Sequence, residues 1–188
     1  LPVVRLHTGD ISFYSAISEQ IDRLRELDVP FEVIPGVSSV GAAAAAIGQE
    51  LTIPEVSQSV IHTRMAGRTP VPEAESIRSL ASHKALMAIF LSVSMMEKLA
   101  GELVAGAYSE DTPVAVVERA SWPGERVVRG TVGDIAAKVR EAGIKKTALI
   151  FVGDSLRASI ENTGENTGKN TGKESKLYNK DFKHGYRK

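Results

Sequence analysis

The stretch LTIPEVSQSVIHTRMAGRTPVPE, residues 51–73, separates two patterns in this sequence. Before it, strand-like apolar runs at 2–7 and 31–34 alternate with helical spacing at 11–28 and from 39 onwards, the order of a parallel α/β layer. After it, a mixture of strands and helices predicts a mixed sheet. Its strands are expected at 56–63, 85–91, 112–118, 125–130 and 147–152, and its helices at 73–82, up to 106 and at 131–142.

The sequence therefore predicts an α/β fold with two domains, residues 1–52 and 53–154. From residue 155 to 188 the apolar pattern ends, and the repeat ENTGENTGKNTG contains no residue that builds a core. We expect a flexible tail there. Because eight basic and four acidic residues lie in this tail while the whole chain has a net charge of zero, the preceding body is acidic.

Composition excludes several classes of function. The 188 residues include no cysteine, which removes disulfides and thiolate metal sites, and the four histidines lie too far apart to suggest a metal site. No apolar run is long enough for a membrane span, so the expected location is the cytoplasm, with no membrane partner. An acidic body without a basic stripe also argues against a nucleic-acid partner.

Three loops follow predicted strands, where open α/β sheets bind ligands: 7–10, 35–39 and 91–92. Gly9 lets a ligand approach the backbone, and Asp10 is placed to accept a hydrogen bond from a ligand hydroxyl or amine. Ser38 or Ser39 is expected to cap one following helix, and Ser92 or Ser94 another. The alternative is that these are ordinary turns. No phosphate-binding motif is present and no catalytic acid or base can be assigned.

Four arginines flank two loops that proline stiffens. Arg64 and Arg68 bracket the first loop, and Arg119 and Arg126 flank the second, SWPG. A guanidinium group on a rigid loop suits recognition of a carboxylate, which it binds through two parallel hydrogen bonds. Surface ion pairs with acids such as Glu73 are the alternative, and residue type alone favours them.

The segment ELTIPEVSQSVIHTRMAGRTPVPE, residues 50–73, closely resembles the corresponding segment of precorrin-4 and cobalt-precorrin-4 C11-methyltransferases, members of the tetrapyrrole methylase family. HTGDISFYS, VIPGVSS, EDTPVAVVERASWPGERVVRGTV and TALIFVG agree with that family in the same order. The resemblance implies a two-domain fold with S-adenosylmethionine in a cleft between the domains, usually as a homodimer. It also implies methyl transfer to C-11 of a corrin precursor, a small-molecule tetrapyrrole substrate, in cobalamin biosynthesis.

Carried over by motif, the resemblance implies a set of cofactor-binding residues: Thr8, Gly9, Asp10, Phe13, Ser38, Ser39, Leu91 and Ala120. It makes Arg64 and Arg68, with Arg119 and Arg126 as secondary candidates, the residues that grip substrate carboxylates. Ile11 stands where relatives commonly have proline. Relatives also begin with an earlier strand and a Gly-Pro-Gly-Asp loop, so we expect the N-terminal part of the first domain to be missing from this sequence.

Two other functions fit the pattern. The first is a methylase of the same fold acting on ribosomal RNA or a diphthamide intermediate, which the acidic body opposes. The second is a non-catalytic fragment that dimerises through an exposed sheet edge.

Overall fold

A computed structural model describes residues 3–157. The chain divides into two compact units, Leu1–Ala42 and Ala43–Lys188. The domain boundary after residue 52 stays a prediction. The tail expected at 155–188 lies outside the described residues from 158 on, whereas Ser155 and Leu156 are buried and belong to the packed body.

The first unit contains helix α1, Ile17–Glu26, and the start of α2, Ser39–Ile47. The expected helix at 11–28 is shorter because residues 11–15 form turns and Ala16 has a left-handed backbone, with φ of 50°. The predicted cap of the second helix is confirmed, since the Ser38 hydroxyl accepts the N–H of Val40 at 3.3 Å.

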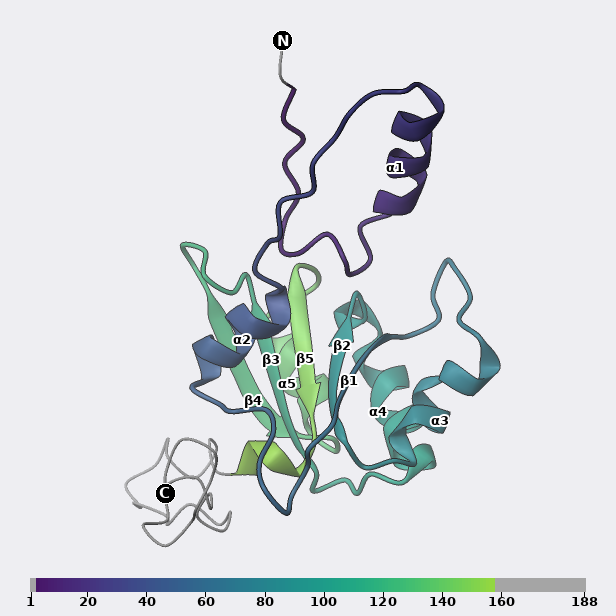
Figure 1. Ribbon diagram of the computed structural model, residues 1–188. Coiled ribbons are helices and arrows are strands. Elements are labelled where there is room, and N and C mark those ends of the chain that lie inside the picture. Colours follow the sequence, from purple (N-terminus) through teal and green to yellow (C-terminus); the bar gives the residue numbers. More distant parts are fainter. Residues whose placement is uncertain (1–2, 158–188) are drawn as a thin grey trace, which may run out of the picture. The chain divides into compact units, whose positions relative to one another are not determined.

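The prediction of strands at 2–7 and 31–34 is wrong. No strand forms within residues 3–42, and the apolar side chains of these segments are exposed, with Val3 91%, Leu6 89% and Ile34 69% accessible. A strand is defined by its hydrogen-bonded neighbours, and an apolar run alone does not supply them. These segments run without a ladder among the described residues (Figure 1).

The second unit is built on a five-stranded sheet with the order β1-β2-β5-β3-β4. Its strands are β1 (Val60–Arg64), β2 (Leu86–Phe90), β3 (Pro113–Glu118), β4 (Arg126–Thr131) and β5 (Ala148–Val152). β1 and β2 are parallel, and β5 runs antiparallel to both β2 and β3. β1, β2 and β3 therefore end at the same edge of the sheet, as the mixed-sheet prediction allows.

Three helices cover one face of this sheet (Figure 1): α3 (Ile77–Ala81), α4 (Met96–Gly106) and α5 (Ile135–Glu141). Their buried side chains form one core with alternate residues of the strands, such as Met87 and Ile89 on β2. The alternate residues on the opposite face, including Leu86 and Phe151, are fully buried as well. The central strands are therefore apolar on both faces, which is why they read as continuous hydrophobic runs.

Short 3-10 turns join these elements: η1 (Glu73–Glu75), η2 (Val93–Met95) and η3 (Asp154–Leu156). The single helix expected at 73–82 is split because the Ser76 hydroxyl accepts the N–H of Ser79 at 3.2 Å and starts α3 there.

Just after the end of α4, the buried Tyr108 hydroxyl donates to the Ala85 carbonyl oxygen. Burial, with a smaller contribution from Asp154, raises the pKa of Tyr108 to about 12, so the phenol keeps its proton.

Gly106 sets the distance between α3 and α4. A β-carbon at this position would lie 2.4 Å from the Arg78 carbonyl oxygen and 2.5 Å from the Ala81 β-carbon. Both are far inside van der Waals contact, and neither atom belongs to a side chain that can swing away. The two helices pack this closely only because residue 106 has no side chain.

We predict that Gly106→Ala lowers the free energy of unfolding by about 1–3 kcal/mol, the typical cost of overpacking. The matched control is Gly101→Ala on the same helix, where an added β-carbon meets no atom within 4 Å. That change should raise stability by about 0.5–1 kcal/mol, because alanine favours the helix. Urea titrations monitored by circular dichroism measure both. Equal effects of the two variants would contradict the packing argument.

Candidate functional site

In the first unit, the Asp10 carboxylate joins two loops. One oxygen accepts the Ser12 N–H at 2.8 Å, and the other accepts the Gly36 N–H at 3.0 Å, 26 residues away in sequence. A β-carbon at Gly36 would lie 2.1 Å from the Gly9 carbonyl oxygen. The loops at 8–10 and 35–39 therefore touch through backbone, and one carboxylate holds them together.

Hydrogen bonds from Ser12, through its side chain and its backbone N–H, and from the Gly36 N–H lower the pKa of Asp10. The group is thus ionised at neutral pH and is a strong acceptor for both loops. This is a structural role that the sequence did not indicate. Direct contact of Asp10 with a ligand stays a prediction.

The other candidates of the first unit gather around these loops. Gly9 has φ of 69°, a left-handed backbone that glycine adopts without strain, and a β-carbon there would lie 3.7 Å from the Ser39 nitrogen. Phe13 donates its backbone N–H to the Asp10 carbonyl at 3.4 Å. Thr8 is exposed and Ser38 is half-buried. Hydroxyl groups and accessible backbone thus lie beside the start of α2.

In the second unit, the remaining candidates share one edge of the sheet. Arg64 ends β1 and pairs with Phe90 at the end of β2, and Leu91 follows directly. Arg119 and Ala120 follow β3, where the Arg119 N–H donates to the Thr147 carbonyl at 2.9 Å, next to the start of β5. Arg126 begins β4 opposite Glu118. Residues far apart in sequence are brought to one edge, as the ligand-binding rule for such sheets predicts.

The backbone at this edge is strained. Leu91, Arg119 and Ser121 have left-handed conformations, with φ of 54°, 52° and 67°. Such conformations are costly for residues other than glycine and concentrate at functional sites. The Leu91 side chain is 68% exposed, so an apolar group stands in solvent on a strained turn.

The expected helix cap at Ser92 or Ser94 is wrong, because α4 has Met95 at its N-cap position and no side-chain cap hydrogen bond. Ser92 has a different role. Its buried hydroxyl accepts the Met65 N–H at 2.9 Å and donates to the Phe90 carbonyl at 2.7 Å, and it caps no helix. Ser92 thereby ties the residue after β1 to the end of β2. Sequence reasoning missed this role because Met65 follows β1 and Phe90 ends β2, and the pairing of these two strands was unknown.

The four arginines fall into two classes. The Arg64 guanidinium donates to the carbonyl oxygens of Met65, Thr69 and Pro70, at 3.2, 3.2 and 2.8 Å, and so it holds its own loop closed. Arg126 pairs with the buried Glu118 at 2.6 Å and donates to the Ala142 carbonyl at 2.7 Å. Within residues 3–157, the structure gives the side chains of Arg68 and Arg119 no hydrogen bond or ion pair.

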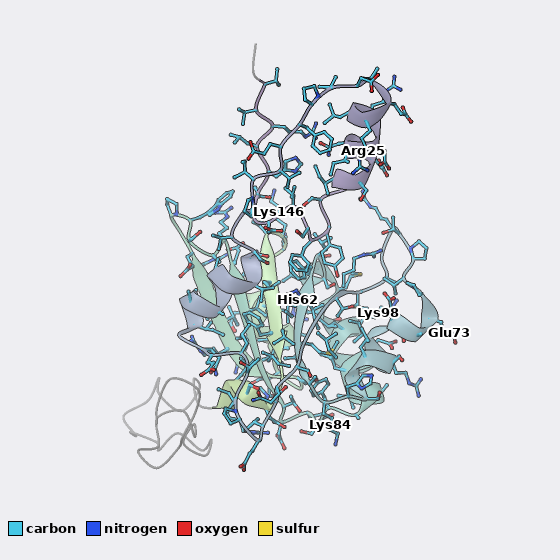
Figure 2. The ribbon with its side chains drawn as sticks, viewed as in Figure 1. Arg25, His62, Glu73, Lys84, Lys98 and Lys146 are labelled. Carbon is cyan, nitrogen blue, oxygen red and sulfur yellow. The ribbon has the colours of Figure 1, made fainter. Side chains whose placement is uncertain are left out.

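Two further polar residues lie near this edge and were not among the candidates (Figure 2). His62 shares a face of β1 with Arg64, and its ring stands edge-on to Phe90 with centroids 6.0 Å apart. Burial lowers the pKa of His62, which keeps it neutral at pH 7. Lys146 directly precedes the Thr147 that bonds to Arg119. Its only signal in the sequence is its place before a strand.

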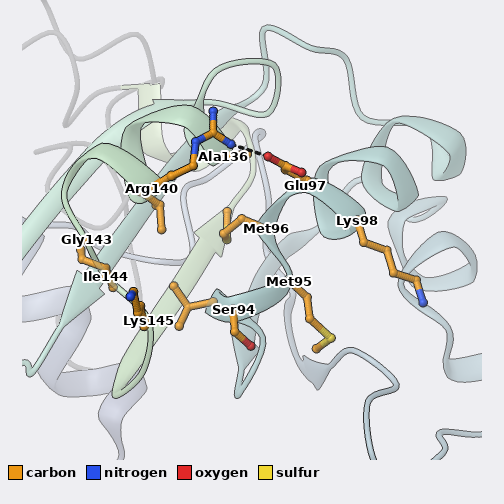
Figure 3. A pocket seen from close by; sticks show the side chains of 12 residues that line it. Ser94, Met95, Met96, Glu97, Lys98, Ala136, Arg140, Gly143, Ile144 and Lys145 are labelled. Carbon is orange, nitrogen blue, oxygen red and sulfur yellow. Dashed lines mark hydrogen bonds and ion pairs between the residues drawn. The ribbon is translucent and has the colours of Figure 1, made fainter.

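A separate pocket of about 610 Å³ lies between the start of α4 and the end of α5 (Figure 3). The ion pair between Glu97 and Arg140 crosses it, and its lining includes none of the candidate residues. No cluster of His, Cys, Asp or Glu within the described residues could hold a metal ion. Over the same residues, no helix is long and apolar enough to cross a membrane.

Comparison with known proteins gives consistent matches. The chain is 56% identical over 186 residues to the cobalt-precorrin-4 C(11)-methyltransferase of Methanocaldococcus jannaschii, covering 99% of this chain and 68% of that protein. A solved structure of a cobalt precorrin-4 methyltransferase superposes with a TM-score of 0.80 at 51% identity, covering 82% of this chain and 64% of that one. The chain thus spans about two thirds of each.

The uroporphyrin-III C-methyl transferase of Thermus thermophilus, solved in complex with S-adenyl homocysteine, superposes with a TM-score of 0.64 at 25% identity. The superposition covers 79% of this chain and 64% of the Thermus thermophilus chain. These likenesses confirm the expected fold class. Residues 2–136 match the family model described as Tetrapyrrole (Corrin/Porphyrin) Methylases. The chain therefore belongs to the tetrapyrrole methylase family.

Proposed function

We propose that this chain transfers a methyl group from S-adenosylmethionine to C-11 of precorrin-4 or cobalt-precorrin-4, a reaction of cobalamin biosynthesis. Its family and the names of its relatives support this assignment. The observation that carries it is the sheet edge of the second unit. There, Leu91 follows β2, Arg119 and Ala120 follow β3, and Arg68 lies in the loop after β1. No protein group engages the side chains of Arg68 and Arg119 within the described residues.

The residues present fit S-adenosylmethionine. Its ribose and amino-acid groups need hydrogen-bonding partners and close backbone approach, which Thr8, Gly9, Ser38 and Ser39 offer around the joined loops. In the first unit we assign Phe13 to its apolar parts and Asp10 to keeping the loops in place, while Leu91 and Ala120 stay cofactor-binding candidates by the family resemblance. When bound, the cofactor supplies a methyl group that its sulfonium has already activated.

Arg68 and Arg119 suit a large substrate with several carboxylates. They follow β1 and β3, which are three strand spacings apart, roughly 14 Å. A tetrapyrrole carries carboxylates around its rim, so one substrate can offer a carboxylate to each of the two loops. Because Arg64 and Arg126 are already hydrogen-bonded, we assign them to support the two loops and reserve direct carboxylate contact for Arg68 and Arg119.

The chain's contribution to the reaction is positioning. The attacking ring carbon is electron-rich and the transferred methyl is activated, so alignment of the two can supply much of the rate enhancement. The arginines fix the macrocycle, and the joined loops fix the cofactor. No step in this mechanism requires a general base from the protein.

We also propose that the protein is a homodimer and works in the cytoplasm, on the strength of the family resemblance. Sedimentation velocity of the purified chain tests the first proposal. A single species with the mass of one chain at micromolar concentration would contradict it.

The direct test of the function is calorimetric titration with S-adenosylhomocysteine, followed by an assay of methyl transfer to precorrin-4. We expect a dissociation constant in the micromolar range, about −8 kcal/mol at 1 μM, and a product methylated at C-11. Cofactor binding with methylation at another carbon would overturn the assigned substrate position.

Replacing Asp10 should weaken cofactor binding by separating the loops. We predict that Asp10→Ala lowers S-adenosylhomocysteine affinity about tenfold, because the loops then have to be ordered upon binding. Asp10→Asn keeps one acceptor oxygen and should lose less. The control is Asp22→Asn, which removes an exposed ion pair with Arg25 on α1 and should leave affinity unchanged. Equal losses in the Asp10 and Asp22 variants would refute this role.

Replacing Arg68 should weaken substrate binding and spare the cofactor. We predict that Arg68→Ala and Arg119→Ala each raise KM for precorrin-4 by about tenfold or more, the typical value of a hydrogen bond to a charged group. Affinity for S-adenosylhomocysteine should not change. Arg78→Ala, which removes an exposed arginine from α3, is the control.

Arg64→Ala should behave differently from these variants. It removes three hydrogen bonds to loop carbonyls, so we expect a loss of about 1–3 kcal/mol in stability, visible in thermal unfolding. If Arg68→Ala lowered cofactor and substrate affinity equally, the carboxylate-binding role would be wrong.

A further inference from the structure

The loop between β3 and β4, residues 119–125, carries the chain's single tryptophan. Trp122 is 53% exposed, and its indole makes no hydrogen bond within residues 3–157. About half of the Trp122 surface is therefore accessible to a ligand, and tryptophan is enriched where proteins bind partners because it combines a large apolar ring with a polar N–H. The proposed function assigns a role to its neighbours Arg119 and Ala120 but leaves Trp122 without one.

The loop is rigid. At its base, Glu118 and Arg126 form an ion pair at 2.6 Å, and Glu118 is largely buried. Within the loop, the backbone N–H of Trp122 donates to the Arg119 carbonyl at 2.9 Å, and the backbone N–H of Glu125 donates to the Trp122 carbonyl at 3.0 Å. The Glu125 carboxylate closes the loop by accepting the Ser121 N–H at 2.7 Å.

These contacts fix the backbone on both sides of Trp122. Arg119 and Ser121 are held in left-handed conformations, and Gly124 has φ of 84°. Strain of this kind persists only where the surroundings impose it. The loop therefore holds the backbone that carries the indole, and a ligand that binds there does not have to order this backbone first.

The position of the loop points to the occupant. It follows β3 at the edge where Arg119 and Arg68 are available for carboxylates, and Leu91 exposes its side chain after β2. Under the proposed function, the ligand that meets this edge carries carboxylates on its rim and a conjugated macrocycle between them. Aromatic side chains pack on such rings with a favourable energy beyond the area they bury.

We propose that Trp122 is a substrate-binding residue whose indole packs against the macrocycle of the tetrapyrrole while Arg119 binds a carboxylate on its rim. This inference rests on the proposed function and extends it, because it assigns recognition of the ring itself to one side chain. Trp122 is a positioning and affinity determinant and takes no part in bond making.

The first test is kinetic. Trp122→Ala should raise KM for precorrin-4 about tenfold with little change in kcat, and Trp122→Phe should restore most of the loss because it keeps an aromatic face. S-adenosylhomocysteine affinity should be the same in all three proteins. Val104→Ala, at an exposed apolar side chain on α4, is the control and should leave KM unchanged.

The second test measures binding without turnover. Because Trp122 is the single tryptophan, its fluorescence excited at long wavelength reports on this loop alone. Uroporphyrin III, a stable carboxylated tetrapyrrole, should quench it in a saturable manner, and S-adenosylhomocysteine should not. The affinity of the variants is then followed through the porphyrin absorption band, where Trp122→Ala should bind about tenfold more weakly than the parent chain.

The outcomes separate the two proposals. If the parent chain binds the porphyrin and methylates precorrin-4 but Trp122→Ala does both equally well, the Trp122 proposal is wrong and the proposed function stands. If the parent chain binds no tetrapyrrole, both are wrong. If Trp122→Ala leaves KM unchanged but shifts the sedimentation coefficient, the indole belongs to an interface between copies of the chain, which also overturns the proposal.

Discussion

The direction of β5 decides where the functional residues of the second unit gather. β5 lies between β2 and β3 and runs against both, so β1, β2 and β3 end at one edge of the sheet. The loops that begin with Met65, Leu91 and Arg119 therefore emerge at the same edge, although they are spread over 55 residues of sequence. If β5 ran parallel to β2 and still paired antiparallel with β3, then β3 would run against β2, and the loop that begins with Arg119 would lie at the far edge of the sheet.

The loops at this edge are stabilised by hydrogen bonds and an ion pair that arginines at their ends make to other protein groups. Loop carbonyls need donors, and the Arg64 fork serves three of them. At the base of the loop after β3, Arg126 forms an ion pair with Glu118 and donates to the Ala142 carbonyl. Each loop therefore contains one arginine bound to the protein and one that points to no protein group in the described residues. Support and recognition are thus divided between side chains of the same type.

Much of the second unit could be predicted from the sequence, since its central strands are apolar on both faces and its helices place apolar residues at helical spacing. The conformation of the segments 2–7 and 31–34 could not be predicted, because an apolar run does not show whether neighbouring strands are available to pair with it. Nor could the split between Arg64 and Arg68, which depends on where loop carbonyls converge. Ser92 and Asp10 looked like a helix cap and a ligand contact, but each bonds backbone whose position only the folded chain defines.

The contact between Gly9 and Gly36 has a consequence for inheritance. The two loops meet backbone to backbone with no room for a side chain, so their geometry is a joint property of two distant segments. A chimera of two family members that divides the chain between residues 10 and 35 would combine loops that were never fitted to each other. Recombination should therefore keep this geometry only when both loops come from the same parent. Sequence variation in these loops is then confined to side chains that point away from the backbone contact.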